Sequence, residues 1–199
     1  MSEEAIRAIE FRSNGELMRQ CAQLGYLDGV VIDMTYGLGA FWNVWQPSTL
    51  ITNDLYIGDT DMTEDATCIP MDDNSVDSAV FDPPYKLNGT SGYGGPADMD
   101  RQYGVHGPYA NAKTRHSLLL DGTAEALRIA RRYALIKCMD QISSGKYNPQ
   151  TFLVWEHAKR HGGKLVDLLH VLGGREQPYG TRQIHSRRNY SSLLVLETS

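Results

Sequence analysis

Cysteine is scarce in this sequence, and long apolar runs are absent from it. The three cysteines are too few and too scattered for a disulfide framework or a zinc cluster, so we expect a reducing, cytoplasmic setting and no metal site. No stretch approaches the roughly 18 apolar residues of a transmembrane helix, so we expect no membrane partner. The first residues carry acids instead of an apolar segment, and they do not resemble a secretory signal.

Positive charge is rare in the first part of the chain. Residues 1–85 hold 3 Lys or Arg against 15 Asp or Glu, a balance of −12, whereas residues 86–199 have a balance of +7. An acidic part favours a cationic ligand, and a basic part favours a polyanion such as nucleic acid, because Lys and Arg neutralise phosphates. Chance clustering of charges on solvated faces explains the same asymmetry about as well.

Short apolar runs alternate with segments of helical spacing along all 199 residues. Strands are expected at 29–35, 49–56, 75–81, 133–139, 164–172 and 191–197, a weak strand or its exit loop at 66–70, and helices within 3–26, directly after Gly39, at about 118–132 and at 148–163. The alternation predicts one α/β domain over residues 1–199 with a mostly parallel sheet. The Gly-rich stretch 86–117 is predicted to be a long loop that covers the substrate as a lid.

A strand, an acid and a Gly-x-Gly turn follow one another in VVIDMTYGLGAFW, an order typical of a nucleotide-binding corner. Gly37 and Gly39 allow the backbone to approach a ligand closely. Trp42 stands where a dinucleotide fingerprint has its third glycine, which disfavours a nicotinamide or flavin dinucleotide. Asp33 suits an ammonium or sulfonium group. Asp54, at the tip of the next strand, is placed to accept hydrogen bonds from ribose hydroxyls, although tight turns use the same residue types.

A sharper signal is Asp82-Pro83-Pro84-Tyr85, at the carboxyl end of the apolar run 75–81. Ligands of open parallel sheets bind at that end. Two prolines restrict the backbone, so that the Pro83 carbonyl and the Asp82 carboxylate are two fixed acceptors beside the flat face of Tyr85. This set suits a planar ring with an exocyclic NH2 group, and a plain strand-ending turn is the simpler alternative.

These motifs resemble those of the S-adenosylmethionine-dependent DNA amino-methyltransferases, which carry an Asp-Pro-Pro-Tyr motif and methylate adenine N6 or cytosine N4. The resemblance covers most of the chain. It implies a Rossmann-like class I methyltransferase with a mostly parallel seven-stranded sheet, a terminal antiparallel strand and helices on both faces. The residues that it implies for catalysis are Asp82, Pro83, Pro84 and Tyr85. Those that it implies for S-adenosylmethionine binding are Asn14, Gly15, Asp33, Tyr36, Gly37, Gly39, Asp54, Asp65 and Ala66.

The resemblance also implies a reaction, in which the amine of a flipped-out base attacks the methyl group directly. No cysteine lies between residues 69 and 137, so methylation at the C5 carbon of cytosine, which needs a cysteine nucleophile, is disfavoured. Adenine is the working target and cytosine N4 the alternative within the family. The chain departs from the family where ARRY replaces the usual Pro-Gly-Gly turn before the fifth predicted strand.

A separate target-recognition domain does not fit into this chain. Target recognition is then expected from loop 86–117, from the basic stretch 159–190, from a second copy of the chain or from a partner subunit. The residues predicted to contact nucleic acid are Lys86, Arg101, Lys113, Arg115, Arg182, Arg187 and Arg188. DNA, in a bacterial or phage-infected cell, is the expected partner. RNA, a protein amide or a nucleic-acid-binding module without turnover are the alternatives.

Overall fold

Seven strands form one sheet in the order β1-β8-β9-β5-β4-β2-β3. The structure is a computed structural model that describes residues 5–10, 13–85, 87, 109, 111–173, 184–186 and 188–199. The strands are β1 (Ile9–Glu10), β2 (Val30–Asp33), β3 (Thr49–Thr52), β4 (Val76–Phe81), β5 (Ala130–Cys138), β8 (Lys164–Leu172) and β9 (Tyr190–Glu197). β9 is antiparallel to both of its neighbours, and the other neighbouring pairs are parallel. The predicted mostly parallel sheet is confirmed, and its antiparallel strand lies inside the sheet between β8 and β5.

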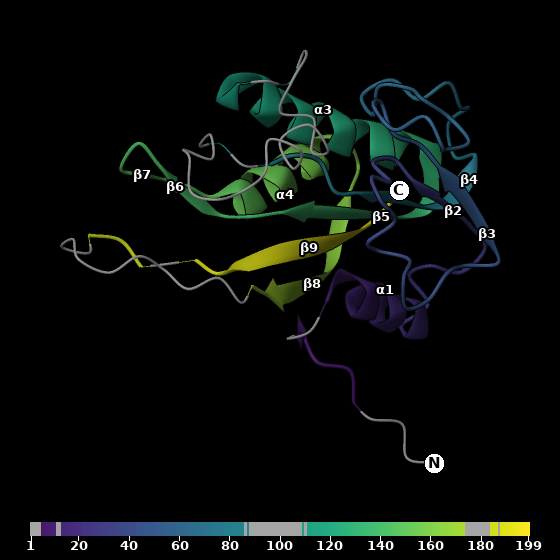
Figure 1. The fold of residues 1–199 in the computed structure, drawn as a ribbon, viewed down its shortest axis with the longest axis horizontal. Helices are drawn as coiled ribbons and strands as arrows, with labels where there is room; N and C mark the ends of the chain where they lie inside the picture. The colour runs from purple at the N-terminus through teal and green to yellow at the C-terminus, as the bar shows by residue number, and fades with distance from the viewer. Residues whose placement is uncertain are drawn as a thin grey trace.

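Helices cover both faces of the sheet, as predicted (Figure 1). The helix α1 (Asn14–Gln23) packs on one face, and α3 (Ala112–Ile129) and α4 (Gln150–Arg160) pack on the other. Side chains alternate between the faces along each strand, so that Val31 belongs to the core beneath α1 and Ile32 to the core beneath α3. A strand that is buried on both faces carries a continuous apolar run, which is why the sequence pattern located β2 and β4. Of the helices in the described residues, none combines the length and apolar character of a membrane span.

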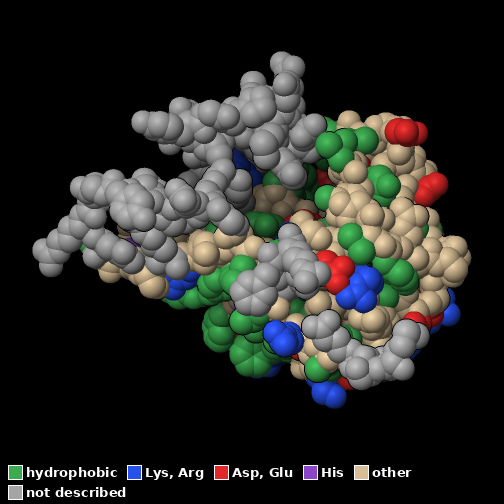
Figure 2. All heavy atoms as spheres, turned by 60° about the horizontal axis from the view of Figure 1, so that its bottom comes forward, with side chains coloured by type: hydrophobic (Ala, Val, Ile, Leu, Met, Phe, Trp, Pro, Cys, Tyr) green, Lys and Arg blue, Asp and Glu red, His purple; other side chains and the backbone are tan. Residues whose placement is uncertain are grey.

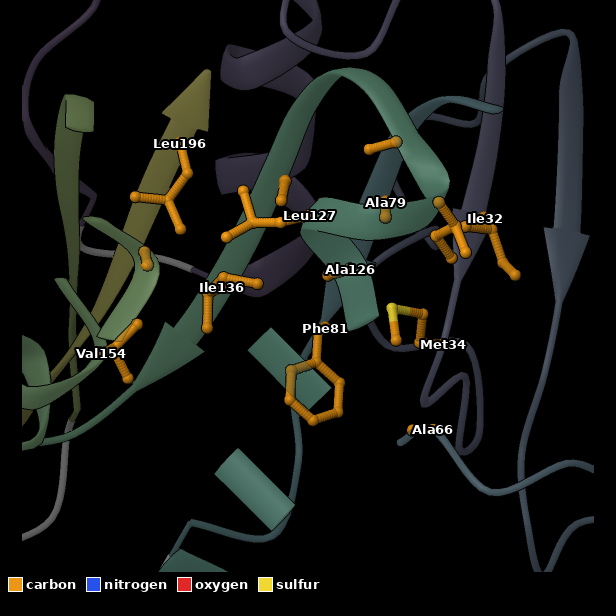
Figure 3. Close-up of a cluster of buried hydrophobic side chains, with 14 of the residues drawn as sticks. Ile32, Met34, Ala66, Ala79, Phe81, Ala126, Leu127, Ile136, Val154 and Leu196 are labelled. Carbon is orange, nitrogen blue, oxygen red and sulfur yellow. The ribbon is translucent and has the colours of Figure 1, made fainter. Parts of the chain in front are cut away.

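The core beneath α3 fixes the point where β4 ends. Phe81, the last residue of β4, lies among core side chains that include Leu127 and Ile136 (Figure 3). A Cβ added to Gly122 of α3 would lie 2.3 Å from Cζ of Phe81, so only glycine allows the helix to approach this ring. Because Phe81 directly precedes Asp82, the packing of this ring sets the position of the Asp-Pro-Pro-Tyr segment.

Tight turns replace the helix that was predicted directly after Gly39. The backbone N–H of Gly39 donates to the carbonyl of Tyr36 at 2.9 Å, and that of Trp42 donates to the carbonyl of Gly39 at 3.0 Å. Gly39 has a φ of +72°, a left-handed conformation that suits a turn. The Trp42 side chain is buried and donates to the carboxylate of Asp33, so this segment folds back onto the end of β2. The helix prediction was wrong because these turns and this side-chain bond outweigh the helical spacing.

Residues 66–70 form a turn in place of a strand, in agreement with the alternative of an exit loop. The N–H of Cys68 donates to the carbonyl of Asp65 at 2.9 Å. The N–H of Ile69 donates to the Glu125 carboxylate of α3 at 2.7 Å, where a strand would use a neighbouring strand. The Glu125 side chain of α3 therefore provides the hydrogen-bond acceptor that a neighbouring strand would provide in a sheet.

The first helix lies within the predicted range 3–26, and the chain before it forms a strand that was not predicted. Ser13 caps α1, because its hydroxyl accepts from the N–H of Glu16 at 3.2 Å. Before this cap, Ile9–Glu10 forms β1, which pairs in parallel with β8. The prediction of a helix within residues 3–26 is thus confirmed, as Asn14–Gln23.

The helix α3 begins at Ala112, earlier than predicted and within the predicted loop 86–117. Asn111 and Thr114 form a capping box, in which each side chain accepts from the backbone N–H of the other residue. The remainder of that stretch lies outside the described residues, except Leu87 and Tyr109. A hairpin that was not predicted, β6 (Gln141–Ser143) with β7 (Lys146–Asn148), follows β5.

Candidate active site

One pocket lies where the neighbouring strands β2, β3 and β4 end. Asp33 is the last residue of β2, Asp54 follows β3, and Asp82 directly follows β4. The carboxyl ends of parallel strands meet at one edge of the sheet, which brings these three acids together. The pocket encloses about 240 Å³. Its lining consists of Asn14, Asp33, Met34, Thr35, Tyr36, Gly37, Leu38, Ala40, Phe41, Asp54, Leu55, Tyr56, Glu64, Ala66, Asp82, Pro84, Tyr109 and Leu118.

Most of the residues predicted to bind a cofactor line this pocket. They are Asn14, Asp33, Tyr36, Gly37, Asp54 and Ala66. Gly15, Gly39 and Asp65 lie next to lining residues but outside the lining itself. A Cβ on Gly15 would lie 2.0 Å from Oδ1 of Asn43, so this glycine lets α1 pack closely on the turn before β3. Gly15 therefore has a packing role, and its neighbour Asn14 is the one that lines the pocket.

The Gly-x-Gly turn and the acid after β3 are bonded to each other. Gly37 and Gly39 have φ values of +56° and +72°, a backbone conformation that favours glycine. The N–H of Gly37 donates to Oδ2 of Asp54 at 2.9 Å, and the N–H groups of Tyr56 and Ile57 donate to Oδ1 at 2.9 and 3.1 Å. Asp54 thus holds the turn in place, and its remaining lone pairs are available to a ligand.

Asp33 is 2% exposed and accepts two hydrogen bonds from its own neighbourhood. The N–H of Thr35 donates to Oδ1 at 3.0 Å, and Nε1 of Trp42 donates to Oδ2 at 2.7 Å. Burial raises the pKa of Asp33 to about 7, and the negative charges of Asp82 and Asp54 add to this rise. The two hydrogen bonds oppose it but do not cancel it. A cationic group in the pocket would favour the ionised form of this carboxyl.

Asp65 is engaged by protein groups beside the pocket. Tyr109 donates to Oδ2 at 2.5 Å, and the N–H and hydroxyl of Thr67 donate to Oδ1 at 2.9 and 2.7 Å. Burial raises the pKa of Asp65, but the hydrogen bonds from Tyr109 and Thr67 outweigh it, so that the pKa lies below its usual value. Asp65 is therefore a carboxylate that anchors Tyr109 in the pocket wall.

An apolar and aromatic wall completes the pocket, and sequence patterns did not reveal it. Phe41, Leu55, Tyr56 and Leu118 belong to it. They come from three separate segments, and only the folded sheet edge brings them together. Flat or aliphatic groups of a ligand would be buried against them.

Asp82 is paired with a buried lysine that sequence reasoning missed. Nζ of Lys137, in β5, lies 3.1 Å from Oδ2 of Asp82, and the Lys137 side chain is only 5% exposed. The backbone N–H of Asp82 donates to the hydroxyl of Thr35 at 2.9 Å. Burial raises the pKa of the Asp82 carboxyl above its usual value, and the Lys137 ammonium opposes this rise. A charged residue within the apolar run YALIKCM was the sequence signal for this pair.

Two glutamines hold the end of the Asp-Pro-Pro-Tyr segment. Nε2 of Gln141 donates to the carbonyl of Tyr85 at 2.7 Å, and Nε2 of Gln150 donates to the same carbonyl at 3.0 Å. The Gln141 amide also donates to Oε1 of Gln150 at 3.0 Å and accepts from the N–H of Leu87 at 3.1 Å. Gln150 is fully buried, so these bonds link α4, the β6–β7 hairpin and the segment that begins at Asp82. No sequence motif signalled them.

The predicted nucleic-acid contacts are only partly described. Lys86, Arg101, Arg182 and Arg187 lie outside the described residues. Lys113 is exposed in the first turn of α3, and the Arg188 guanidinium lies 4.2 Å from the ring centroid of Tyr147 in β7. On the face shown in Figure 2, Lys and Arg side chains are dispersed among acidic and apolar ones.

Arg115 does not fit the predicted phosphate contact. It is 4% exposed, and its Nε donates to the carbonyl of Tyr109 at 3.1 Å. The spacing of basic residues in the sequence could not distinguish this side chain, which turns into the protein, from its exposed neighbour Lys113. Arg115 instead stabilises the position of a pocket residue.

The chain matches no protein-family model and no curated protein, but its fold is similar to those of solved methyltransferases. One is a provisionally assigned methyltransferase of Bacillus halodurans C-125, with a TM-score of 0.55, 10% identity, and coverage of 90% of this chain and 97% of that chain. Another is magnesium protoporphyrin IX methyltransferase of Synechocystis PCC 6803 with bound S-adenosylhomocysteine, with a TM-score of 0.54, 10% identity, and coverage of 94% and 81%. A third is a provisionally assigned RNA methyltransferase of Pyrococcus horikoshii, with a TM-score of 0.54, 12% identity, and coverage of 93% and 82%.

The fold is that of S-adenosylmethionine-dependent methyltransferases. The Synechocystis enzyme has been solved with S-adenosylhomocysteine and with S-adenosylmethionine, the cofactor that the sequence motifs predicted for this chain. At identities of 10–12% the similarity concerns the fold, and the substrate has to be argued from the site.

Proposed function

We propose that this chain transfers the methyl group of S-adenosylmethionine to the exocyclic amine of a DNA base, adenine N6 or cytosine N4. The observation that carries the proposal is the position of Asp82 at the end of β4, in the lining of the same pocket as Asp33, Gly37 and Asp54. An acceptor for an amine and a set of groups suited to the cofactor thus share one cavity. The Asp-Pro-Pro-Tyr segment supports the choice of an aromatic amine.

The pocket residues fit S-adenosylmethionine by their chemistry. Asp33 would hold its ammonium group, and Asp54 would accept hydrogen bonds from the ribose hydroxyls while it retains its bond from Gly37. Apolar wall residues such as Ala66 and Leu118 would cover the adenine ring. When bound there, S-adenosylmethionine supplies an electrophilic methyl group on its sulfonium.

The residues after β4 then prepare the acceptor amine. An aromatic amine is a poor nucleophile because its lone pair is delocalised into the ring. The Asp82 carboxylate and the Pro83 carbonyl would accept its two N–H bonds, which favours a tetrahedral nitrogen and frees the lone pair. Lys137 occupies Oδ2 of Asp82, so Oδ1 is the oxygen left for the amine. The negative charge of the Asp82 carboxylate also stabilises the positive charge that develops on the amine nitrogen. Tyr85 offers a ring on which the flipped base stacks.

The choice of DNA rests on the motif and on the positive charge of residues 86–199. Arg188 supports it, because its guanidinium packs over the ring of Tyr147 in the β6–β7 hairpin. The first residue of this hairpin, Gln141, donates to the Tyr85 carbonyl. A phosphate bound there would lie on the element that is bonded to the catalytic segment. Contacts of this kind position a nucleic acid without reading its sequence.

Transfer of label from methyl-labelled S-adenosylmethionine tests the proposal. Unmethylated duplex DNA, single-stranded DNA and total RNA are offered separately, and the modified nucleoside is identified by mass spectrometry. We expect N6-methyladenine or N4-methylcytosine in DNA with the wild type. Asp82→Ala should lose this label, because the amine then lacks its carboxylate acceptor.

The matched control is Asp72→Ala, which removes an exposed acid of the same type outside the pocket and should leave transfer unchanged. Binding of S-adenosylhomocysteine by Asp82→Ala establishes that the variant remains folded. Label in RNA alone would replace the DNA substrate by an RNA substrate. Cofactor binding without label in any nucleic acid would contradict the proposal and direct the search to protein amides.

A further inference from the structure

Lys137 is placed where a lysine is costly. It lies in β5 between buried neighbours, and its side chain is 5% exposed. The only ion pair that it forms among the described residues is with Asp82, and its Nζ lies 5.2 Å from the ring centroid of Phe41, a pocket residue. Burial of an ammonium group costs several kcal/mol unless it is well paired, so a lysine that serves only to fill this space would be a poor choice.

We propose that Lys137 is a positioning residue that holds Asp82 as an oriented carboxylate, with one oxygen fixed and the other free for the acceptor amine. For methyl transfer, this inference rests on the function proposed above. Lys137 does not line the pocket and acts through Asp82.

Two hydrogen bonds determine how the Asp82 side chain is presented. Its backbone N–H is bonded to the Thr35 hydroxyl, and its Oδ2 is bonded to Lys137. With the backbone N–H and one carboxylate oxygen held, rotation of the Asp82 carboxylate is restricted. Orientation of this kind is what a reaction with a positioned nucleophile requires.

The charged surroundings make the ionised form of Asp82 depend on Lys137. Asp33, at the end of β2, is an acid that interacts with Asp82, and repulsion between the two charges favours protonation of one of them. Cys138, next to Lys137, has a pKa raised to about 12 by burial and carries no charge at neutral pH. Burial also raises the pKa of Asp82, and Lys137 is the group that opposes this. Without Lys137 the carboxyl would hold its proton to higher pH, and a protonated carboxyl donates where the amine needs an acceptor.

The first test is the pH dependence of kcat at saturating cofactor in Lys137→Met, which keeps the length and apolar stem of the side chain. The acidic limb of the profile should move to higher pH by about 1–3 units, the range for loss of an opposite charge at this distance. Activity should then recover in alkaline buffer. Lys137→Arg keeps the charge and should retain an acidic limb close to that of the wild type. A variant that loses activity equally at every pH would overturn the proposal, because a purely structural role predicts that result.

The second test exchanges the carboxylate for an acceptor that does not titrate. Asp82→Asn leaves the Lys137 ammonium buried without its counter-charge, so it should be less stable and less active than the double variant Asp82→Asn, Lys137→Met. The double variant should show no acidic limb from this position. If Lys137→Met is equally harmful in the wild type and in the Asp82→Asn background, the two residues do not act as a pair and the inference fails.

A third readout does not need activity. The carboxyl carbon of Asp82 is followed by NMR in protein labelled with 13C at aspartate carboxyls, and its signal is assigned by its loss in Asp82→Asn. Its titration midpoint should rise in Lys137→Met relative to the wild type. An unchanged midpoint would overturn the inference even in an active enzyme. A raised midpoint in a protein without methyl transfer would uphold the pair while the proposed function fails.

Discussion

Lowering the pH from 8 to 6 should weaken the binding of S-adenosylhomocysteine about tenfold, because its ammonium group would bind to an Asp33 that is ionised. Burial raises the pKa of Asp33 to about 7. At that pKa the carboxyl is about nine-tenths ionised at pH 8 and about one-tenth ionised at pH 6. S-adenosylhomocysteine is the suitable probe, since its amino group stays largely protonated over this range and it undergoes no reaction.

Isothermal titration calorimetry measures both consequences of this argument. The dissociation constant should rise as the pH falls from 8 to 6. At pH 6 binding should release up to one proton, which is detected by comparing buffers of different ionisation enthalpy. Asp33→Asn is the control, because an amide does not titrate, and its weaker binding should be independent of pH. An equal slope in the wild type and in Asp33→Asn would refute the assignment of the proton to Asp33.

Three further predictions concern stability and positioning. The folded state holds a proton on Asp33 up to about pH 7, whereas the unfolded chain loses it above the ordinary aspartate pKa of 3.8. The free energy of unfolding should therefore fall as the pH rises from about 4 to 7. Urea titrations should show a smaller fall in Asp33→Asn. Gln150→Leu should lower kcat but leave S-adenosylhomocysteine affinity unchanged, because it removes one of the two amide donors to the Tyr85 carbonyl, outside the pocket; an equal loss of affinity would contradict this. Gly122→Ala should cost about 1–3 kcal/mol in denaturant unfolding, because its Cβ would lie 2.3 Å from Phe81, and Phe81→Leu should restore part of that loss.

Most strands of the sheet could be predicted from their apolar runs, and β4 is buried on both faces. Val76–Phe81 and Lys164–Leu172 were located almost to the residue. Val76–Phe81 is largely buried, whereas Lys164–Leu172 is mostly half-buried or exposed and was found because apolar residues outnumber polar ones along it. The short strand Ile9–Glu10 could not be found in this way. It contributes two residues at a sheet edge, and its pairing with β8 depends on a partner more than 150 residues away.

The candidate site was predictable where one local motif supplies the residues and hidden where the fold assembles them. Asp33 ends β2, Gly37 lies in the turn after it, and Asp82 directly follows β4, so their location at one sheet edge follows from the parallel order. Gln150 gave no signal, because the carbonyl that it binds belongs to a different element. Lys137 gave a signal, because it is a charged residue inside an apolar strand. Its partner, Asp82, could be identified only once β4 was placed beside β5.

The acidity of residues 1–85 has a structural explanation besides a cationic ligand. Residues 34–48 and 53–75, both described in full, contain no helix, so their backbone N–H groups need other acceptors. Acidic side chains provide them. The carboxylates that accept from backbone N–H groups of these segments include those of Asp33, Asp54 and Asp65. Asp61 and Asp77 accept in the same way from Thr52 and Val30, which belong to strands.

Two of these acids, Asp33 and Asp54, also line the pocket, so they serve as scaffold and as candidate ligand contacts at once. Substitution by alanine would remove a backbone acceptor together with the ligand contact, and lost binding would then have two causes. Substitution by asparagine keeps one acceptor oxygen for the backbone and removes the charge. A loss of cofactor affinity in Asp54→Asn without a loss of unfolding free energy would therefore assign the effect to the ligand, and equal losses in both would assign it to the turn at Gly37.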